Sequence, residues 1–133
     1  MGKKGLENFT ATLASLKSFL DMPIQTDRDK AGIIQAFEFT FEQCWKALQQ
    51  HAASSGVSVG SPKSAFTYAL QNNMINAKNE RVWLEMLEDR NLTSHTYKKE
   101  LADQVIKRIR DQYLTAFEGL LRAIYTAPTS AVE

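Results

Sequence analysis

The strongest constraint on the fold is the spacing of apolar residues, which recur at steps of three and four along most of the chain. Such steps place successive side chains on one face of an α-helix, whereas a strand places them on alternate faces. Long stripes of this kind lie at about 6–20, 27–53, 79–90 and 94–124, and a shorter one lies at 62–74. The spacing therefore predicts helices throughout and favours no strand.

Turn residues separate these segments, for example Met22-Pro23, Ser54-Ser55-Gly56 and Ser61-Pro62. The connections are short, so consecutive helices must lie side by side and run in opposite directions. We therefore predict an all-α fold, an antiparallel up-and-down four-helix bundle with one extra short helix. The 133 residues form one domain, residues 1–133, with a core at about 6–125 and a frayed tail at 126–133.

Composition excludes several classes of protein. The net charge of +1 does not indicate a nucleic-acid-binding protein, although a chain of this charge can still carry a local basic patch. The single cysteine, Cys44, lies on the apolar face of its helix and cannot form an intramolecular disulfide, so we expect a packed core thiol. It makes no standard zinc spacing with the two histidines, and we expect no metal and no cofactor. No membrane-length apolar run or secretory leader stands out, which favours a soluble, cytoplasmic protein.

The densest group of reactive side chains is the stretch from Arg90 to Tyr97. In one unbroken helix, Arg90 and His95 would project about 140° apart, because five residues are not a whole number of turns. Asn91, Thr93 and Ser94 are residue types that break and cap helices. We therefore expect a break here, with Arg90 ending one helix and His95 starting the next, which Thr93 or Ser94 would cap.

That placement suggests chemistry on a phosphate. The positive end of a helix disfavours imidazolium, so His95 would stay neutral and able to accept a proton. Arg90 and the free N–H groups at the start of the last helix could hold the phosphate oxygens. These parts suffice for metal-independent cleavage of RNA through its 2′-hydroxyl, and equally for simple nucleotide binding. The plainer alternative is a capped helix junction with a hydrogen-bonded His95, in which Arg90 makes a buried salt bridge, for example to Glu38 or Glu42.

Phe39 lies roughly opposite the apolar stripe of its helix, since two residues correspond to a rotation of about 200°. Two interpretations remain open at this stage. Another helix of the same chain covers it, or it belongs to an oligomer or partner interface.

The stretch Arg90-Asn-Leu-Thr-Ser-His95-Thr-Tyr97 resembles the Arg-x4-6-His motif of HEPN domains, in the Arg-x4-His-x-Tyr form of the nucleotidyltransferase substrate-binding branch. Other stretches resemble the same branch: Gln35 to Glu42 with Trp45-Lys46, Ser61-Pro62, and Trp83 to Asp89. The likeness extends over about Leu6 to Tyr125. It implies a helical bundle that forms a homodimer, with the Arg and His near the dimer cleft.

Many HEPN domains are metal-independent ribonucleases, and this branch is paired with a minimal nucleotidyltransferase as toxin and antitoxin. By position, the resemblance makes Arg90 and His95 the catalytic candidates and Tyr97 the tyrosine that the partner AMPylates. Glu38 and Glu42, with Asn91 and Ser94, are supporting polar candidates that could orient the motif or simply make helix-surface pairs.

The resemblance thus implies a ribonuclease toxin that acts on RNA and is neutralised by a minimal nucleotidyltransferase protein. The alternative is a non-catalytic subunit of a two-component nucleotidyltransferase, which presents a nucleotide or substrate.

Overall fold

The computed structural model describes residues 3–95 and 98–126, and over these residues it is helical with no strand. The helices are α1 (Lys3–Asp21), α2 (Asp27–Ser54), α3 (Pro62–Gln71), α4 (Glu80–His95), α5 (Lys99–Arg108) and α6 (Leu114–Thr126). The prediction of an all-α fold is confirmed.

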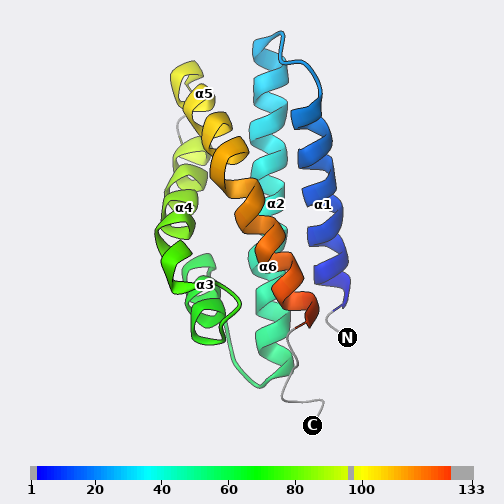
Figure 1. The fold of residues 1–133 in the computed structure, drawn as a ribbon, viewed down its shortest axis with the longest axis vertical. Coiled ribbons are helices and arrows are strands. Elements are labelled where there is room, and N and C mark those ends of the chain that lie inside the picture. Colours follow the sequence, from blue (N-terminus) through cyan, green and yellow to red (C-terminus); the bar gives the residue numbers. More distant parts are fainter. Residues whose placement is uncertain (1–2, 96–97, 127–133) are drawn as a thin grey trace.

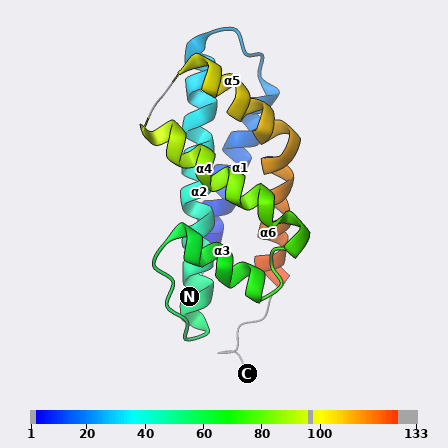
Figure 2. The same ribbon diagram turned by 90° about the vertical axis from the view of Figure 1, so that its left-hand side faces the viewer.

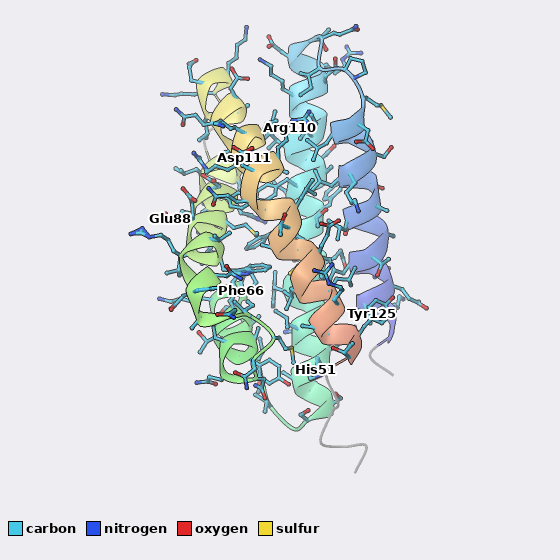
Figure 3. All side chains as sticks on the ribbon, in the orientation of Figure 1. His51, Phe66, Glu88, Arg110, Asp111 and Tyr125 are labelled. Atoms are coloured by element: carbon cyan, nitrogen blue, oxygen red, sulfur yellow. The ribbon has the colours of Figure 1, made fainter. Side chains whose placement is uncertain are left out.

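The long helices alternate in direction along the molecule (Figure 1). α1 and α2 form an antiparallel pair, and α5 and α6 follow one another in a single rod that packs against α2. α4 crosses α2 obliquely, as the view turned by 90° shows (Figure 2). α3 packs against α2 and α4 at the lower end of the molecule, the end at which Figure 3 labels His51. The hydroxyl of Tyr68 on α3 lies 2.7 Å from Nδ1 of His51. The inclination of α4 distinguishes this arrangement from a regular bundle of parallel rods.

The helix starts follow local hydrogen bonding. Thr26 caps α2 by accepting a bond from the backbone N–H of Asp29, and the Asp29 carboxylate accepts bonds from Gln25 and Thr26. Those backbone donors lower the pKa of Asp29. Ser61 caps α3 in the same manner, as its position before Pro62 predicts.

The start of α4 differs from the sequence prediction. The apolar stripe that begins at about residue 79 predicts Asn79, a residue type that caps helices, as the cap of α4, but Asn79 ends a 3₁₀ turn, Ala77–Asn79, that leads directly into Glu80. Asn76 supplies the side-chain cap instead, by accepting a bond from the N–H of Lys78. The 3₁₀ turn moves the capping position three residues upstream.

The core is aromatic and centres on Phe37 of α2, which is fully buried. The ring of Phe37 stacks on Tyr113 with centroids 5.7 Å apart, and Phe117 and Phe41 pack beside it. Cys44 is buried in the same core, and burial raises the pKa of its thiol well above the usual value. The prediction of a packed core thiol is confirmed.

A π-helical turn, Ile109–Tyr113, joins α5 to α6. The apolar stripe of this rod advances in steps of four, and each such step rotates the stripe by about 40° in an α-helix. A π turn closes i→i+5 hydrogen bonds and so holds more residues per turn. It therefore rotates the stripe back toward the core, which keeps Val105, Ile109, Tyr113 and Phe117 buried together.

The π turn also places two side chains on one carboxylate of α4. Arg108 and Tyr113 are five residues apart, a spacing that an α-helix would project about 140° apart. Here Arg108 donates two bonds to Asp89, Nε to Oδ2 at 2.7 Å and Nη2 to Oδ1 at 2.8 Å, and the Tyr113 hydroxyl also donates to Oδ2. Asp89 is only 3% exposed, so these three donors replace the water that its carboxylate would otherwise bind.

These contacts alter the proton affinities of both donors. The hydrogen bonds to Asp89 raise the pKa of Arg108, and burial together with the Asp89 carboxylate raises the pKa of Tyr113. Both donors therefore keep their protons, and the cluster of Asp89, Arg108 and Tyr113 joins α4 firmly to the α5–α6 rod.

Replacing Asp89 by Asn should lower the free energy of unfolding by about 3 kcal/mol, because Arg108 loses its bidentate partner in a largely buried place. Urea denaturation measures this change. Asp103→Asn is the matched control, since Asp103 pairs with Lys30 at the surface and its side chain is 56% exposed. The control should leave stability nearly unchanged. Equal losses in the two variants would contradict the role of the Asp89 cluster.

Candidate functional site

The predicted helix break between Arg90 and His95 is wrong. α4 continues without interruption to His95, and the next helix begins only at Lys99. Neither Thr93 nor Ser94 caps a helix. Their hydroxyls instead donate hydrogen bonds to Glu38 of the neighbouring helix α2. Because they have this partner, Thr93 and Ser94 fit inside a continuous helix.

This continuity changes the setting of His95. The residue is exposed and lies in the last turn of α4, where the helix dipole is negative, so the expected effect of a helix N-terminus does not apply. Because α4 is unbroken, Arg90 and His95 project about 140° apart and one chain does not place them on the same face. Asn91 is exposed on α4. Tyr97 lies outside the described residues.

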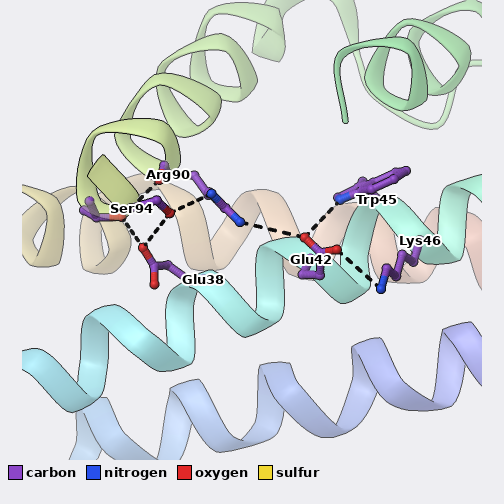
Figure 4. A network of polar contacts seen from close by, with 7 residues as sticks. Glu38, Glu42, Trp45, Lys46, Arg90 and Ser94 are labelled. Carbon is purple, nitrogen blue, oxygen red and sulfur yellow. Dashed lines mark hydrogen bonds and ion pairs between the residues drawn. The ribbon is translucent and has the colours of Figure 1, made fainter. Parts of the chain in front are cut away.

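Arg90 is held in place by a chain of hydrogen bonds to α2 (Figure 4). Its Nη1 donates to Oγ of Ser94 at 2.6 Å, one helical turn further along α4. The Ser94 hydroxyl donates to Oε2 of Glu38 at 3.1 Å, and the Thr93 hydroxyl donates to the same oxygen at 2.6 Å. Glu38 therefore fixes the direction of Arg90 through Ser94, without touching the guanidinium itself.

Glu42 is the second carboxylate at this edge. Its Oε1 lies 3.9 Å from Nη2 of Arg90 and accepts a hydrogen bond from Nε1 of Trp45 at 3.3 Å. Its Oε2 pairs with Nζ of Lys46 at 3.4 Å. The sequence left open whether Glu38 or Glu42 forms a salt bridge with Arg90. In the structure Glu42 forms it, in a loose geometry.

The guanidinium of Arg90 keeps hydrogen-bonding capacity to spare. The Arg90 side chain is 30% exposed, and its contact with Glu42 is too long to be a hydrogen bond. A guanidinium carries five N–H donors. Arg90 is therefore oriented by its neighbours and still able to donate to an incoming phosphate or carboxylate.

The structure also reveals a positioning cluster that the sequence analysis missed. Asp89, next to Arg90 in the chain, makes the buried contacts with Arg108 and Tyr113 described above. The signal lay in the apolar stripe of α4, since Asp89 follows Met86 by three residues and so continues the buried face. An acidic residue at such a position requires a buried partner.

Phe39 is 56% exposed, so no helix of the described chain covers it. Of the two interpretations of Phe39, only an oligomer or partner interface stays open, and it remains a prediction. Within residues 3–95 and 98–126 no helix is long and apolar enough to cross a membrane. Over the same residues, no three His, Cys, Asp or Glu side chains come together as a metal site.

Comparison with known proteins identifies the family. Residues 4–125 match the family described as nucleotidyltransferase substrate binding protein like, and the chain belongs to this family. The match covers every described helix that carries the Arg90 site. The family description implies a nucleotidyltransferase as partner, and the resemblance stated from the sequence is confirmed.

A protein of Thermus thermophilus with a known crystal structure has a similar fold. It is 32% identical in sequence, with a TM-score of 0.76, and the alignment covers 93% of this chain and 98% of the other. A search of curated proteins found no match.

Replacing Thr93 by Val should lower the free energy of unfolding by about 2 kcal/mol, because the isosteric side chain removes a short hydrogen bond to a charged carboxylate. Thr12→Val on α1 is the control, since Thr12 is half-buried and its hydroxyl bonds only to backbone carbonyls. Urea denaturation of Thr93→Val, Glu38→Gln and the double variant measures the coupling between the two residues. Additive effects would show that the Thr93–Glu38 bond contributes nothing of its own.

Proposed function

We propose that this protein is a metal-independent ribonuclease of the HEPN type, which acts as the toxin of a toxin–antitoxin pair. The observation that carries the proposal is the state of Arg90, which is oriented by Ser94 and Glu42 yet retains donors for a phosphate. The motif Arg-x4-His-x-Tyr and membership of the nucleotidyltransferase substrate-binding family support it.

The proposed reaction uses the nucleophile that RNA itself carries. His95 takes the proton of the 2′-hydroxyl, and the 2′-oxygen forms a bond to phosphorus. The 5′-oxygen leaves and takes a proton from solvent, so the products are a 2′,3′-cyclic phosphate and a 5′-hydroxyl. Arg90 donates hydrogen bonds to the phosphate oxygens while their negative charge increases.

The proposal requires two copies of the chain. Arg90 and His95 project about 140° apart on one helix, so we assign the two groups that contact one phosphate to two protomers. We therefore include a homodimer in the proposal, with the exposed ring of Phe39 as part of an interface.

Control of the ribonuclease is assigned to a minimal nucleotidyltransferase in the same cytoplasm. The partner would transfer AMP to the hydroxyl of Tyr97, two residues beyond His95. A bulky anionic group so close to His95 in the chain would compete with RNA for Arg90 and silence the enzyme.

The second candidate is a non-catalytic subunit that presents a nucleotide to the nucleotidyltransferase. The separation of Arg90 and His95 on unbroken α4 favours it, because within one chain only the oriented Arg90 is prepared to bind a phosphate. This function requires Arg90 and does not require His95.

Cleavage of RNA by the purified protein in excess chelator, with intact mass confirming unmodified Tyr97, separates the two candidates. His95→Ala and Arg90→Ala should each lower the cleavage rate by about 100-fold or more, the usual contribution of an acid–base group. Arg81→Ala is the control for charge, because Arg81 is exposed at the other end of α4.

Each outcome has a definite meaning. Cleavage that survives chelator and is lost in His95→Ala supports the ribonuclease. Nucleotide binding that needs Arg90, with no cleavage by the wild type, favours the presenting subunit instead. Cleavage that is unaffected by both variants would contradict the assignment of this site.

A further inference from the structure

Trp45 differs from the core aromatic residues because part of its indole remains accessible. It is half-buried against the core, whereas Trp83, the other tryptophan, is only 4% exposed. Among the described residues, the close aromatic ring pairs involve Trp83 and several phenylalanines but not Trp45. Part of the indole of Trp45 is therefore free to contact a ligand.

Trp45 is also held beside the Arg90 site by a shared carboxylate. Oε1 of Glu42 accepts a bond from the indole Nε1 at 3.3 Å and lies 3.9 Å from Nη2 of Arg90. Figure 4 shows Trp45 and Arg90 on either side of this carboxylate, along the edge of α2 that faces α4. An aromatic surface, a hydrogen-bond acceptor and a cation thus follow one another along one edge.

A nucleotide offers a matching group to each of these three. Its base offers a flat face for stacking and a polar edge, and a ribose joins the base to the phosphate. Proteins that bind single-stranded nucleic acid combine aromatic stacking platforms with cations that contact the backbone. The set of groups at this edge therefore fits one nucleotide of a single strand.

We propose that Trp45 and Glu42 form a nucleobase subsite beside Arg90, and that guanine is the base it prefers. The base stacks on the indole of Trp45, its edge donates hydrogen bonds to Glu42, and its phosphate contacts Arg90. The proposal deepens the proposed function and rests on it, because it specifies the nucleotide next to the phosphate bound by Arg90.

The preference for guanine follows from the chemistry of a carboxylate, which only accepts hydrogen bonds. Guanine carries adjacent N1–H and N2–H₂ donors and can engage both oxygens of Glu42. Adenine and cytosine offer one amino group on that edge, and uracil offers one imino group. Lys46 pairs with Oε2 of Glu42 through a side chain that is 48% exposed, so it can move aside for the base.

The charges at this edge are compatible with a phosphate. Glu42 faces two cations, Arg90 and Lys46, whereas Glu38 accepts hydrogen bonds from the hydroxyls of Thr93 and Ser94. A displaced Lys46 would become available to the phosphate, since its flexible ammonium can reorient. Two cations thus balance two carboxylates, and Glu42 can select the base without a net negative charge at this edge.

Tryptophan fluorescence tests the subsite directly, in titrations of the full chain with GMP, AMP, CMP and UMP in chelator. GMP should quench Trp45 and bind about tenfold more tightly than UMP. Trp45→Phe should abolish the nucleotide-dependent change and leave the steady emission of buried Trp83. Glu42→Gln should weaken GMP binding about tenfold and reduce its advantage over the other nucleotides.

The matched control is Glu88→Gln, which removes the same charge from the exposed outer side of α4 (Figure 3). It should bind GMP as the wild type does. Circular dichroism of each variant confirms that it is folded, and the conservative Trp45→Phe keeps an aromatic side chain at that position.

Three outcomes would overturn the proposal: no fluorescence change with any nucleotide, a change that persists in Trp45→Phe, or equal affinity for all four nucleotides. The outcome of the RNA cleavage assay does not depend on the outcome of the fluorescence titration. Quenching of Trp45 without cleavage keeps the subsite and removes the ribonuclease, whereas cleavage without quenching keeps the ribonuclease and removes the subsite.

Discussion

The placement of α4, the helix that carries Arg90 and His95, depends on the hydrogen bonds of the Asp89 carboxylate. This carboxylate receives two hydrogen bonds from Arg108 and one from Tyr113, in an almost fully buried position. The π turn between Arg108 and Tyr113 brings both donors to one face, which a regular α-helix would not do. Tyr113 also stacks on Phe37, so the same residue connects the polar cluster with the aromatic core. Arg90 is the next residue after Asp89, so the cluster that fixes α4 also fixes the position of the Arg90 backbone.

A second set of contacts then orients Arg90 within that framework. Glu38 acts through the Ser94 hydroxyl, and Glu42 approaches the guanidinium from the other side. These contacts lie at the surface of the α2–α4 crossing, where each contributes less to stability than the buried Asp89 cluster. Their effect is to hold a cation in a fixed direction with unused donors. That state suits the binding of a phosphate better than a tightly closed, bidentate salt bridge would.

The parts of the fold that depend on local sequence could be predicted. Apolar stripes at helical spacing located the helices. Thr26 and Ser61, residue types that cap helices, marked the starts of α2 and α3. The break after Arg90 was predicted wrongly because a Ser or Thr hydroxyl can either cap a helix or bond to a neighbouring element. The choice here depends on Glu38, which lies 55 residues before Thr93 in the sequence. The Asp89 cluster was missed for the same reason, since its partners belong to a different helix. Arg90, Glu38 and Glu42 were singled out from the sequence and lie together in the structure, whereas Tyr97 lies outside the described residues.

The most direct test of the account concerns the sharing of one site by two protomers. Differently tagged Arg90→Ala and His95→Ala chains, each inactive alone, can be co-expressed and the mixed dimer purified through both tags. Because unbroken α4 directs the two side chains to different faces, the account predicts that the mixed dimer regains RNA cleavage in chelator. One of its two sites would then combine an intact Arg90 from one chain with an intact His95 from the other. A mixed dimer as inactive as its parents, beside an active wild type, would contradict the shared site.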